Sequence, residues 1–220
     1  MSALPDTIEI ETASSPDAAV IWLHGLGADG HDFEPVVPEL RLPPRLRVRF
    51  VFPHAPTRPV TINMGMRMRA WYDILQLGGG LEDEPGIRAS QAILEGLIAR
   101  ERTRGIQPQR IVLAGFSQGG AIALHTALRH EARLAGALAL STYLPLAAQA
   151  APERSPASEA LPVFMAHGRF DEIIPLARAQ QSCAHLESLG CRVQWREYPM
   201  PHSVCGEEIA DIAAWLGERL

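Results

Sequence analysis

Lysine is absent from this chain of 220 residues, and all 20 of its basic residues are arginine. Without lysine the chain cannot form a Schiff base on its own side chains, attach pyridoxal phosphate or complete a P-loop. The formal net charge is −5, and the arginines form no basic run. Because a nucleic-acid partner requires a basic surface, we expect no nucleic-acid binding.

Cysteine and long apolar runs are also scarce. The three cysteines, Cys183, Cys191 and Cys205, have no C-x-x-C spacing, which is typical of reduced thiols and not of a disulfide frame or a zinc site. No apolar run approaches the ~20 residues that span a bilayer, and acidic residues such as Asp6 and Glu9 argue against a signal peptide. We expect a cytoplasmic protein with no stable membrane insertion and no metal.

Short apolar segments alternate with longer amphipathic ones along the chain. The expected strands are residues 18–25, 48–56, 110–117, 134–141, 161–168 and 191–199, and the expected helices are residues 82–105, 118–130, 176–190 and 206–220. This alternation predicts an α/β fold with a mostly parallel sheet. No linker divides it, so residues 1–220 are expected to form one domain, with irregular segments at 55–81 and 145–160.

Gly-Phe-Ser-Gln-Gly at residues 115–119 fits the pattern G-x-S-x-G, with an expected strand before it and an expected helix after it. A nucleophilic serine on such a tight turn has strained backbone angles, and glycines two positions away avoid collisions with the neighbouring strand and helix. The pattern therefore indicates Ser117 as a nucleophile. The alternative is that Ser117 is only the N-cap of the helix.

A serine nucleophile needs a base and an acid that orients the base. Among eight histidines, His202 alone follows every plausible acid and lies in a loop after a late strand, which fits the order Ser, acid, His. Asp171 follows the strand 161–168 and is favoured as the acid because its side chain is short. Glu172 is its immediate competitor.

The glycine-rich segment His-Gly-Leu-Gly-Ala-Asp-Gly at residues 24–30 follows an early strand. Its backbone N–H groups could stabilise an oxyanion, with Leu26 as the donor and the N–H of Gln118 as its partner. A phosphate loop is the alternative, but no lysine is present to complete one.

Five motifs occur in a familiar order: HGLGADG, GFSQGGAIAL, LSTYLP, HGRFDEIIP and YPMPHSV. Together they resemble the small carboxylesterase and acyl-protein thioesterase family of α/β-hydrolases over roughly residues 15–218. The resemblance implies an α/β-hydrolase fold with helices on both faces of the sheet and no separate lid domain. It also implies Ser117, Asp171 and His202 as the triad and Leu26 and Gln118 as the oxyanion donors, with no cofactor, and it makes a homodimer plausible.

One residue departs from the family pattern, and one residue pair distinguishes branches of the family. Pro201 stands where the family usually has glycine before the catalytic histidine, so the His202 loop must be rearranged if that glycine needs a positive φ. Thr142-Tyr143 stands where eukaryotic thioesterases usually carry Cys-Trp, which places the chain closer to bacterial carboxylesterases.

The expected function is that of a serine carboxylesterase acting on short- to medium-chain esters through an acyl-enzyme on Ser117. The alternatives are an acyl-protein thioesterase that removes palmitoyl groups and a non-catalytic binding protein. Seven residues could line an acyl groove, although each could equally pack in the core or in a loop: Ile62, Met64, Met66, Trp71, Leu75, Tyr143 and Leu144.

Overall fold

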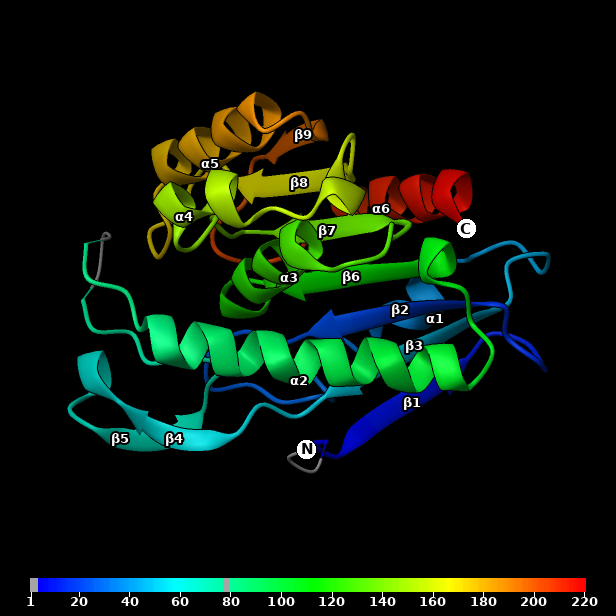
Figure 1. Ribbon diagram of the computed structural model, residues 1–220, viewed down its shortest axis with the longest axis horizontal. Helices are drawn as coiled ribbons and strands as arrows, with labels where there is room; N and C mark the ends of the chain where they lie inside the picture. The colour runs from blue at the N-terminus through cyan, green and yellow to red at the C-terminus, as the bar shows by residue number, and fades with distance from the viewer. Residues whose placement is uncertain (1–3, 77–79) are drawn as a thin grey trace.

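The computed structural model describes residues 4–76 and 80–220 and is organised around a seven-stranded sheet (Figure 1). In spatial order the strands are β1 (Thr7–Glu11), β3 (Val48–Pro53), β2 (Ala18–Leu23), β6 (Ile111–Phe116), β7 (Gly136–Leu140), β8 (Pro162–Gly168) and β9 (Arg192–Tyr198). β1 is antiparallel to β3, and the other neighbouring strands are parallel. The mostly parallel sheet expected from the sequence is confirmed.

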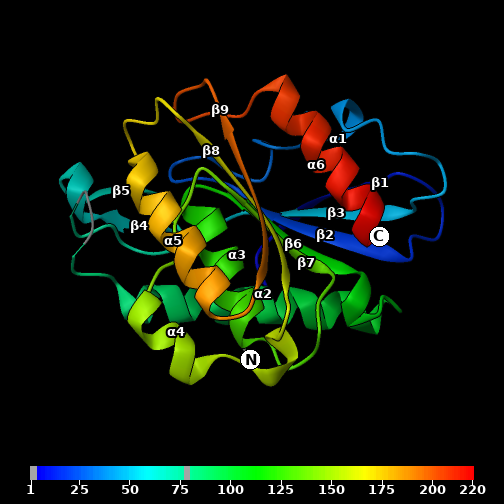
Figure 2. The ribbon, with the colours of Figure 1, turned by 90° about the horizontal axis from the view of Figure 1, so that it is seen from above.

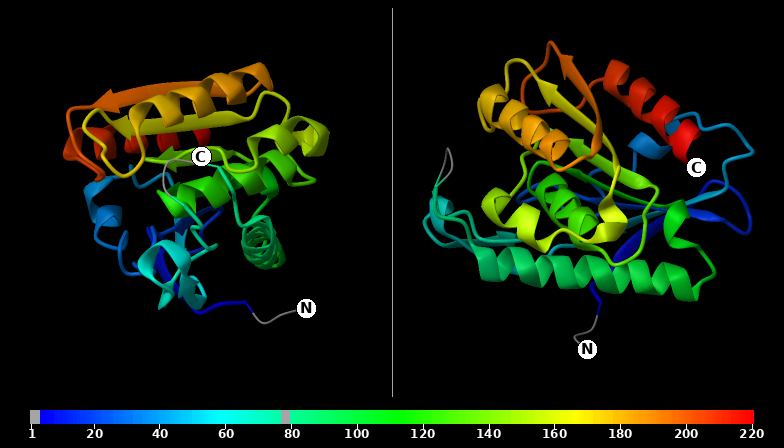
Figure 3. Two further views of the ribbon diagram at one scale, coloured as in Figure 1. Left: turned by 90° about the vertical axis from the view of Figure 1, so that its left-hand side faces the viewer. Right: turned by 45° about the horizontal axis from the view of Figure 1, so that its top comes forward.

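Helices cover both faces of the sheet (Figures 2 and 3). One face carries α2 (Glu84–Thr103), α3 (Gln118–Arg129), α4 (Ala147–Glu153) and α5 (Leu176–Ser188), and the other carries α1 (Val36–Glu39) and α6 (Gly206–Arg219). All six residues of β2 are buried because both faces of this strand are covered. None of the described helices has the length and apolar character needed to cross a membrane.

The structure also contains elements that the sequence analysis missed. Residues 55–81 include a hairpin of β4 (Thr57–Val60) and β5 (Met66–Arg69), and residues 145–160 include α4, so the expectation that both segments are irregular was wrong. Proline obscured both elements, since Pro59 lies inside β4 and Pro152 inside α4. A third missed element is β1, which is short, lies at the edge of the sheet and alternates charged with apolar residues.

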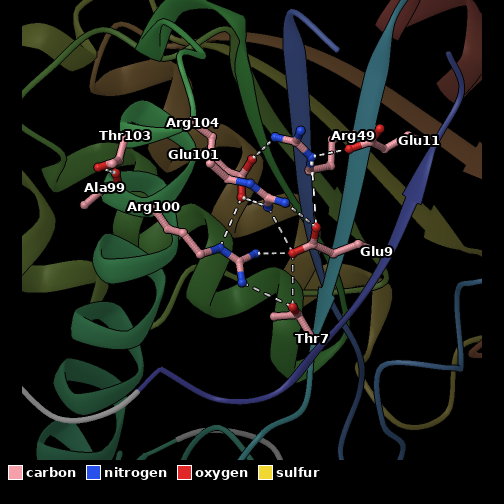
Figure 4. Close-up of polar contacts among 9 residues, drawn as sticks. All are labelled: Thr7, Glu9, Glu11, Arg49, Ala99, Arg100, Glu101, Thr103 and Arg104. Carbon is pink, nitrogen blue, oxygen red and sulfur yellow. Dashed lines mark hydrogen bonds and ion pairs between the residues drawn. The ribbon is translucent and has the colours of Figure 1, made fainter. Parts of the chain in front are cut away.

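A network of ion pairs connects α2 with strands β1 and β3 at the edge of the sheet (Figure 4). The side chain of Glu101 is completely buried and accepts hydrogen bonds from Arg49 on β3 at 2.8 Å and from Arg104 at 2.9 Å. Glu9 on β1 pairs with Arg100 of α2 and with Arg104, the residue that caps the end of α2, each at 2.9 Å. Because a buried carboxylate is costly unless it is paired, Glu101 depends on this arginine set.

We predict that Glu101→Gln destabilises the protein by about 3 kcal/mol, because it leaves the surrounding guanidinium groups without their buried counter-charge. Urea unfolding followed by circular dichroism measures the change. The matched control is Glu131→Gln, which removes a carboxylate that is 81% exposed and 3.5 Å from Arg102 of the same helix. The control should change stability by less than about 0.5 kcal/mol. Equal effects of the two substitutions would contradict a structural role for the buried network.

Candidate active site

Ser117 lies between the end of β6 and the start of α3, at the carboxyl ends of the parallel strands (left in Figure 1). Its backbone angles are φ 54° and ψ −120°, a conformation that non-glycine residues rarely adopt. The turn is held by hydrogen bonds from the Ser117 N–H to the Leu140 carbonyl at 2.8 Å and from the Thr142 hydroxyl to the Ser117 carbonyl at 2.6 Å. The Ser117 side chain makes no capping hydrogen bond, so its hydroxyl is not used as a helix cap.

Two glycines permit this turn because neighbouring backbone lies directly against them. A Cβ at Gly115 would collide with the backbone of Gly119, and a Cβ at Gly119 would collide with the carbonyl oxygens of Leu23 and His24. Any larger residue would therefore push α3 away from β6 or from the end of β2. The glycines of the G-x-S-x-G pattern are thus required by close backbone approach.

Asp171 and His202 form a pair at the ends of β8 and β9. The Asp171 Oδ2 atom lies 2.7 Å from Nδ1 of His202, and Oδ1 accepts hydrogen bonds from the N–H groups of Ile173 and Ile174 at 2.9 and 2.8 Å. The carboxylate is therefore buried but fully hydrogen-bonded. Glu172 is exposed and makes no hydrogen bond or ion pair within the described residues, so the geometry favours Asp171 over it.

The His202 ring is directed toward the turn that carries Ser117. It packs on Phe116, the residue before Ser117, with ring centroids 4.7 Å apart. Since Nδ1 faces Asp171, Nε2 is the nitrogen available to Ser117. Within the described residues no hydrogen bond joins the Ser117 hydroxyl to His202, and such bonds often tighten only when substrate is bound.

Pro201 is compatible with the loop that carries His202. The loop is held by hydrogen bonds from the Phe170 N–H to the Met200 carbonyl at 3.1 Å and from the Ser203 N–H to the Pro201 carbonyl at 2.9 Å. No residue from 199 to 204 has a positive φ. The proline therefore causes no backbone conflict here.

The segment after β2 approaches Ser117 from the other side. A Cβ built on Gly25 would lie 3.6 Å from Cβ of Ser117, so the next residue, Leu26, is close to Ser117. In the described part of the chain the N–H groups of Leu26 and Gln118 make no hydrogen bond. Both are free to donate to an oxygen beside Ser117.

His24 holds this segment in place as a neutral side chain. Its Nδ1 lies 2.7 Å from the Gly25 carbonyl, and its Nε2 accepts a hydrogen bond from the Ala55 N–H at 3.0 Å. Burial lowers the pKa of His24 to about 4, so the ring is uncharged at neutral pH and Nδ1 carries the proton. His24 therefore fixes the loop and does not act as the base.

Trp71 is a structural residue in this arrangement, contrary to its expected place in the groove. It is almost completely buried, its indole N–H donates to the His24 carbonyl at 2.9 Å, and its backbone N–H donates to the Gln118 side chain at 2.7 Å. The Gln118 amide in turn donates to the Tyr72 carbonyl at 2.7 Å. Sequence reasoning did not foresee this second role of Gln118.

An open pocket enclosing about 620 Å³, part of it solvent, begins at Ser117 and Gln118. Its other described walls are Tyr72, Asp73, Ile74, Leu75, Gln76, Leu81, Glu82, Tyr143, Ile173, Ile174 and Arg178. Leu75 and Tyr143 therefore lie where an acyl groove was expected.

The remaining expected groove residues lie elsewhere. Met64 and Met66 are 94% and 61% exposed at the β4–β5 hairpin, and Ile62 precedes them in the same segment. Leu144 is buried beside the pocket but does not line it. Of the walls that sequence reasoning missed, Ile173 and Ile174 come from the turn that carries Asp171, directly after the motif HGRFD.

Comparison with known proteins agrees with this geometry. Residues 6–219 match the model of a family described as phospholipase/carboxylesterase. The chain is 43% identical over 218 residues to acyl-protein thioesterase 1 of Gibberella zeae, covering 94% of this chain and 93% of that protein. It is 43% identical over 217 residues to acyl-protein thioesterase 1 of Mycosarcoma maydis, covering 91% and 90%.

Solved structures show the same fold. The crystal structure of Arabidopsis thaliana SOBER1 superposes with a TM-score of 0.87 at 28% identity and covers 92% of this chain and 98% of its own. That of Zea mays acyl-protein thioesterase 2 gives a TM-score of 0.86 at 26% identity and covers 98% and 99%. The chain therefore belongs to the phospholipase/carboxylesterase family of α/β-hydrolases and is a serine hydrolase.

Proposed function

We propose that the chain hydrolyses acyl thioesters, and carboxylic esters by the same route, through an acyl-enzyme on Ser117. The observation that carries the proposal is the Asp171–His202 pair at 2.7 Å, whose imidazole packs on Phe116, the residue before the strained turn of Ser117. In this proposal Asp171 keeps Nδ1 of His202 protonated and stabilises the imidazolium that forms. The free N–H groups of Leu26 and Gln118 receive the oxyanion.

The reaction proceeds in two halves. Nε2 of His202 takes the Ser117 proton as Oγ attacks the acyl carbonyl, and the same proton then passes to the departing thiol or alcohol. Water next gives a proton to His202 and attacks the acyl-serine. The proton returns to Ser117 as the carboxylic acid leaves, so no cofactor is consumed.

Relatives favour thioesters over the ester substrates expected from the sequence. The curated relatives described above are named acyl-protein thioesterase 1. The Thr142-Tyr143 pair, which suggested the carboxylesterase branch, does not act on the departing atom. Thr142 holds the Ser117 carbonyl, and Tyr143 lines the pocket. This residue pair therefore does not distinguish thioester substrates, which release a thiol, from ester substrates, which release an alcohol.

We predict that Ser117→Ala abolishes hydrolysis and labelling by a fluorophosphonate, because the attacking oxygen is removed.

Asp171→Asn should lower kcat on the order of 10³- to 10⁴-fold by favouring the wrong His202 tautomer. The matched control is Glu172→Gln at the exposed neighbouring position, which should leave kcat within about twofold of the unsubstituted protein. A larger loss in the Glu172 variant would transfer the acid role to that residue.

We predict that, at equal acyl-chain length, thioesters are hydrolysed with the higher kcat/KM. The measurement compares S-acyl N-acetylcysteine methyl esters with the matching O-acyl serine compounds from butyryl to palmitoyl. Efficient turnover of short esters without turnover of any thioester would contradict the thioesterase proposal and support a carboxylesterase. Loss of both activities in Ser117→Ala shows that one site performs them.

A further inference from the structure

The apolar pocket beside Ser117 contains an arginine without an anionic partner. Arg178 of α5 lines the pocket, and its guanidinium carbon lies 3.4 Å from the centroid of the Tyr143 ring. Among the residues that the structure describes, Arg178 forms no ion pair. Its contact with Tyr143 is a cation–π interaction supplemented by a side-chain hydrogen bond to the same tyrosine, and the five N–H donors of a guanidinium exceed what this one partner uses.

Two carboxylates also line the pocket, and each accepts a hydrogen bond from a neutral group. Asp73 accepts hydrogen bonds from the N–H and the hydroxyl of Thr61 at 2.7 and 2.5 Å. Glu82 accepts a hydrogen bond from the Leu146 N–H at 2.9 Å. Both carboxylates keep their negative charge, but within the described residues neither lies within ion-pair distance of the Arg178 guanidinium.

The Arg178 backbone and the ring beneath its side chain are both held in place. The Arg178 N–H donates to the Pro175 carbonyl at 2.8 Å, and its carbonyl accepts a hydrogen bond from the Ser182 hydroxyl at 3.0 Å. Beneath the guanidinium, the Tyr143 hydroxyl is hydrogen-bonded to that of Tyr72 at 2.9 Å. A cation placed in this way is preorganised for a ligand.

The position of His202 shows which part of the substrate enters this pocket. In the proposed reaction His202 protonates the departing group, so that group must lie beside His202. The pocket is lined by Ser117 and Gln118 but not by His202. It therefore leads away from the departing group and receives the acyl group.

We propose that Arg178 binds a carboxylate at the far end of the acyl group, so that preferred substrates include half-thioesters and half-esters of dicarboxylic acids. The inference rests on the proposed acyl-enzyme at Ser117 and adds a preference within the acyl class. The planar guanidinium can bind a carboxylate through two parallel hydrogen bonds. The neighbouring apolar walls Ile173, Ile174 and Leu81 would contact the carbon chain of such an acyl group.

The experiment compares mono-p-nitrophenyl esters of adipic and suberic acid with p-nitrophenyl hexanoate and octanoate, which have equal carbon counts. For each enzyme the measured quantity is the ratio of kcat/KM for the anionic ester to that for the neutral ester of the same length. Arg178→Met should lower this ratio by about 10- to 100-fold, mainly through a higher KM for the anionic ester. Arg178→Lys should retain part of the ratio, because the charge remains without the two-pronged geometry.

The control is Arg192→Met, which removes an equal charge from the exposed first residue of β9. It should leave the ratio as it is in the unsubstituted protein. The same ratio in Arg178→Met as in the unsubstituted protein would overturn the inference and assign Arg178 only a packing role over Tyr143. If the ratio is unchanged but neutral esters are still hydrolysed, the proposed hydrolase function is retained and only the role of Arg178 is rejected. Absence of any Ser117-dependent hydrolysis would overturn both.

Discussion

The turn between β6 and α3 is the constraint on which the rest of the site depends. Ser117 can keep its strained backbone only because β6 and α3 approach each other closely at Gly115 and Gly119. The surrounding fold enforces that approach, since β6 is a central strand between β2 and β7 and α3 is buried along nearly all its length. The strain at one residue is thus maintained by the packing of the whole sheet.

Because the strands beside β6 are parallel, their following loops reach the same edge of the sheet. The loop after β2 brings Gly25 and Leu26 beside Ser117, and the loops after β8 and β9 bring Asp171 and His202. Residues far apart in the chain are therefore brought together by loops at one edge of the sheet. The ion-pair network of Glu101 lies elsewhere, between α2 and the β1–β3 edge (Figure 4), and serves the fold.

The side of the site proposed to receive the oxyanion is built from uncharged buried polar groups. His24, Trp71 and Gln118 connect the loop after β2, the segment after β5 and the first turn of α3 through hydrogen bonds of 2.7–2.9 Å. Leaving such a buried group without its partner costs about 1–3 kcal/mol, so the three elements are fixed relative to one another. The neutral state of His24 keeps positive charge out of this network, consistent with its lowered pKa.

The parts of the fold that the sequence predicted are those governed by local patterns. Strands buried on both faces, such as β2, appear as continuous apolar runs, and α6 shows acidic residues in its first turn and an arginine in its last. The β4–β5 hairpin and α4 were not predictable in this way, because proline interrupts each of them and tertiary contacts decide their structure.

The same distinction between local patterns and tertiary contacts applies to the residues of the candidate site. Ser117, Asp171 and His202 could be chosen from chain order and flanking elements, as could the glycine loop with Leu26. Trp71 could not be placed, because a large aromatic residue in an irregular segment fits a groove and a core equally well. Arg178 gave no signal either, since in sequence it is one arginine on an amphipathic helix and its role depends on Tyr143 beneath it.

Catalytic and binding parts share residues in this structure, and this sharing limits how independently they can change. The N–H groups of Ile173 and Ile174 hold the Asp171 carboxylate, while the same two residues line the acyl pocket. Gln118 is a proposed oxyanion donor through its N–H, while its side chain donates a hydrogen bond to the carbonyl of Tyr72, another pocket wall. A substitution that reshapes these walls therefore also moves the acid or the oxyanion donor. Among the described residues Leu75 has no such link to the proposed catalytic groups, and Arg178 is connected to Gln118 only indirectly, through Tyr143 and Tyr72. We therefore expect acyl preference to change at these two positions while the triad geometry is kept.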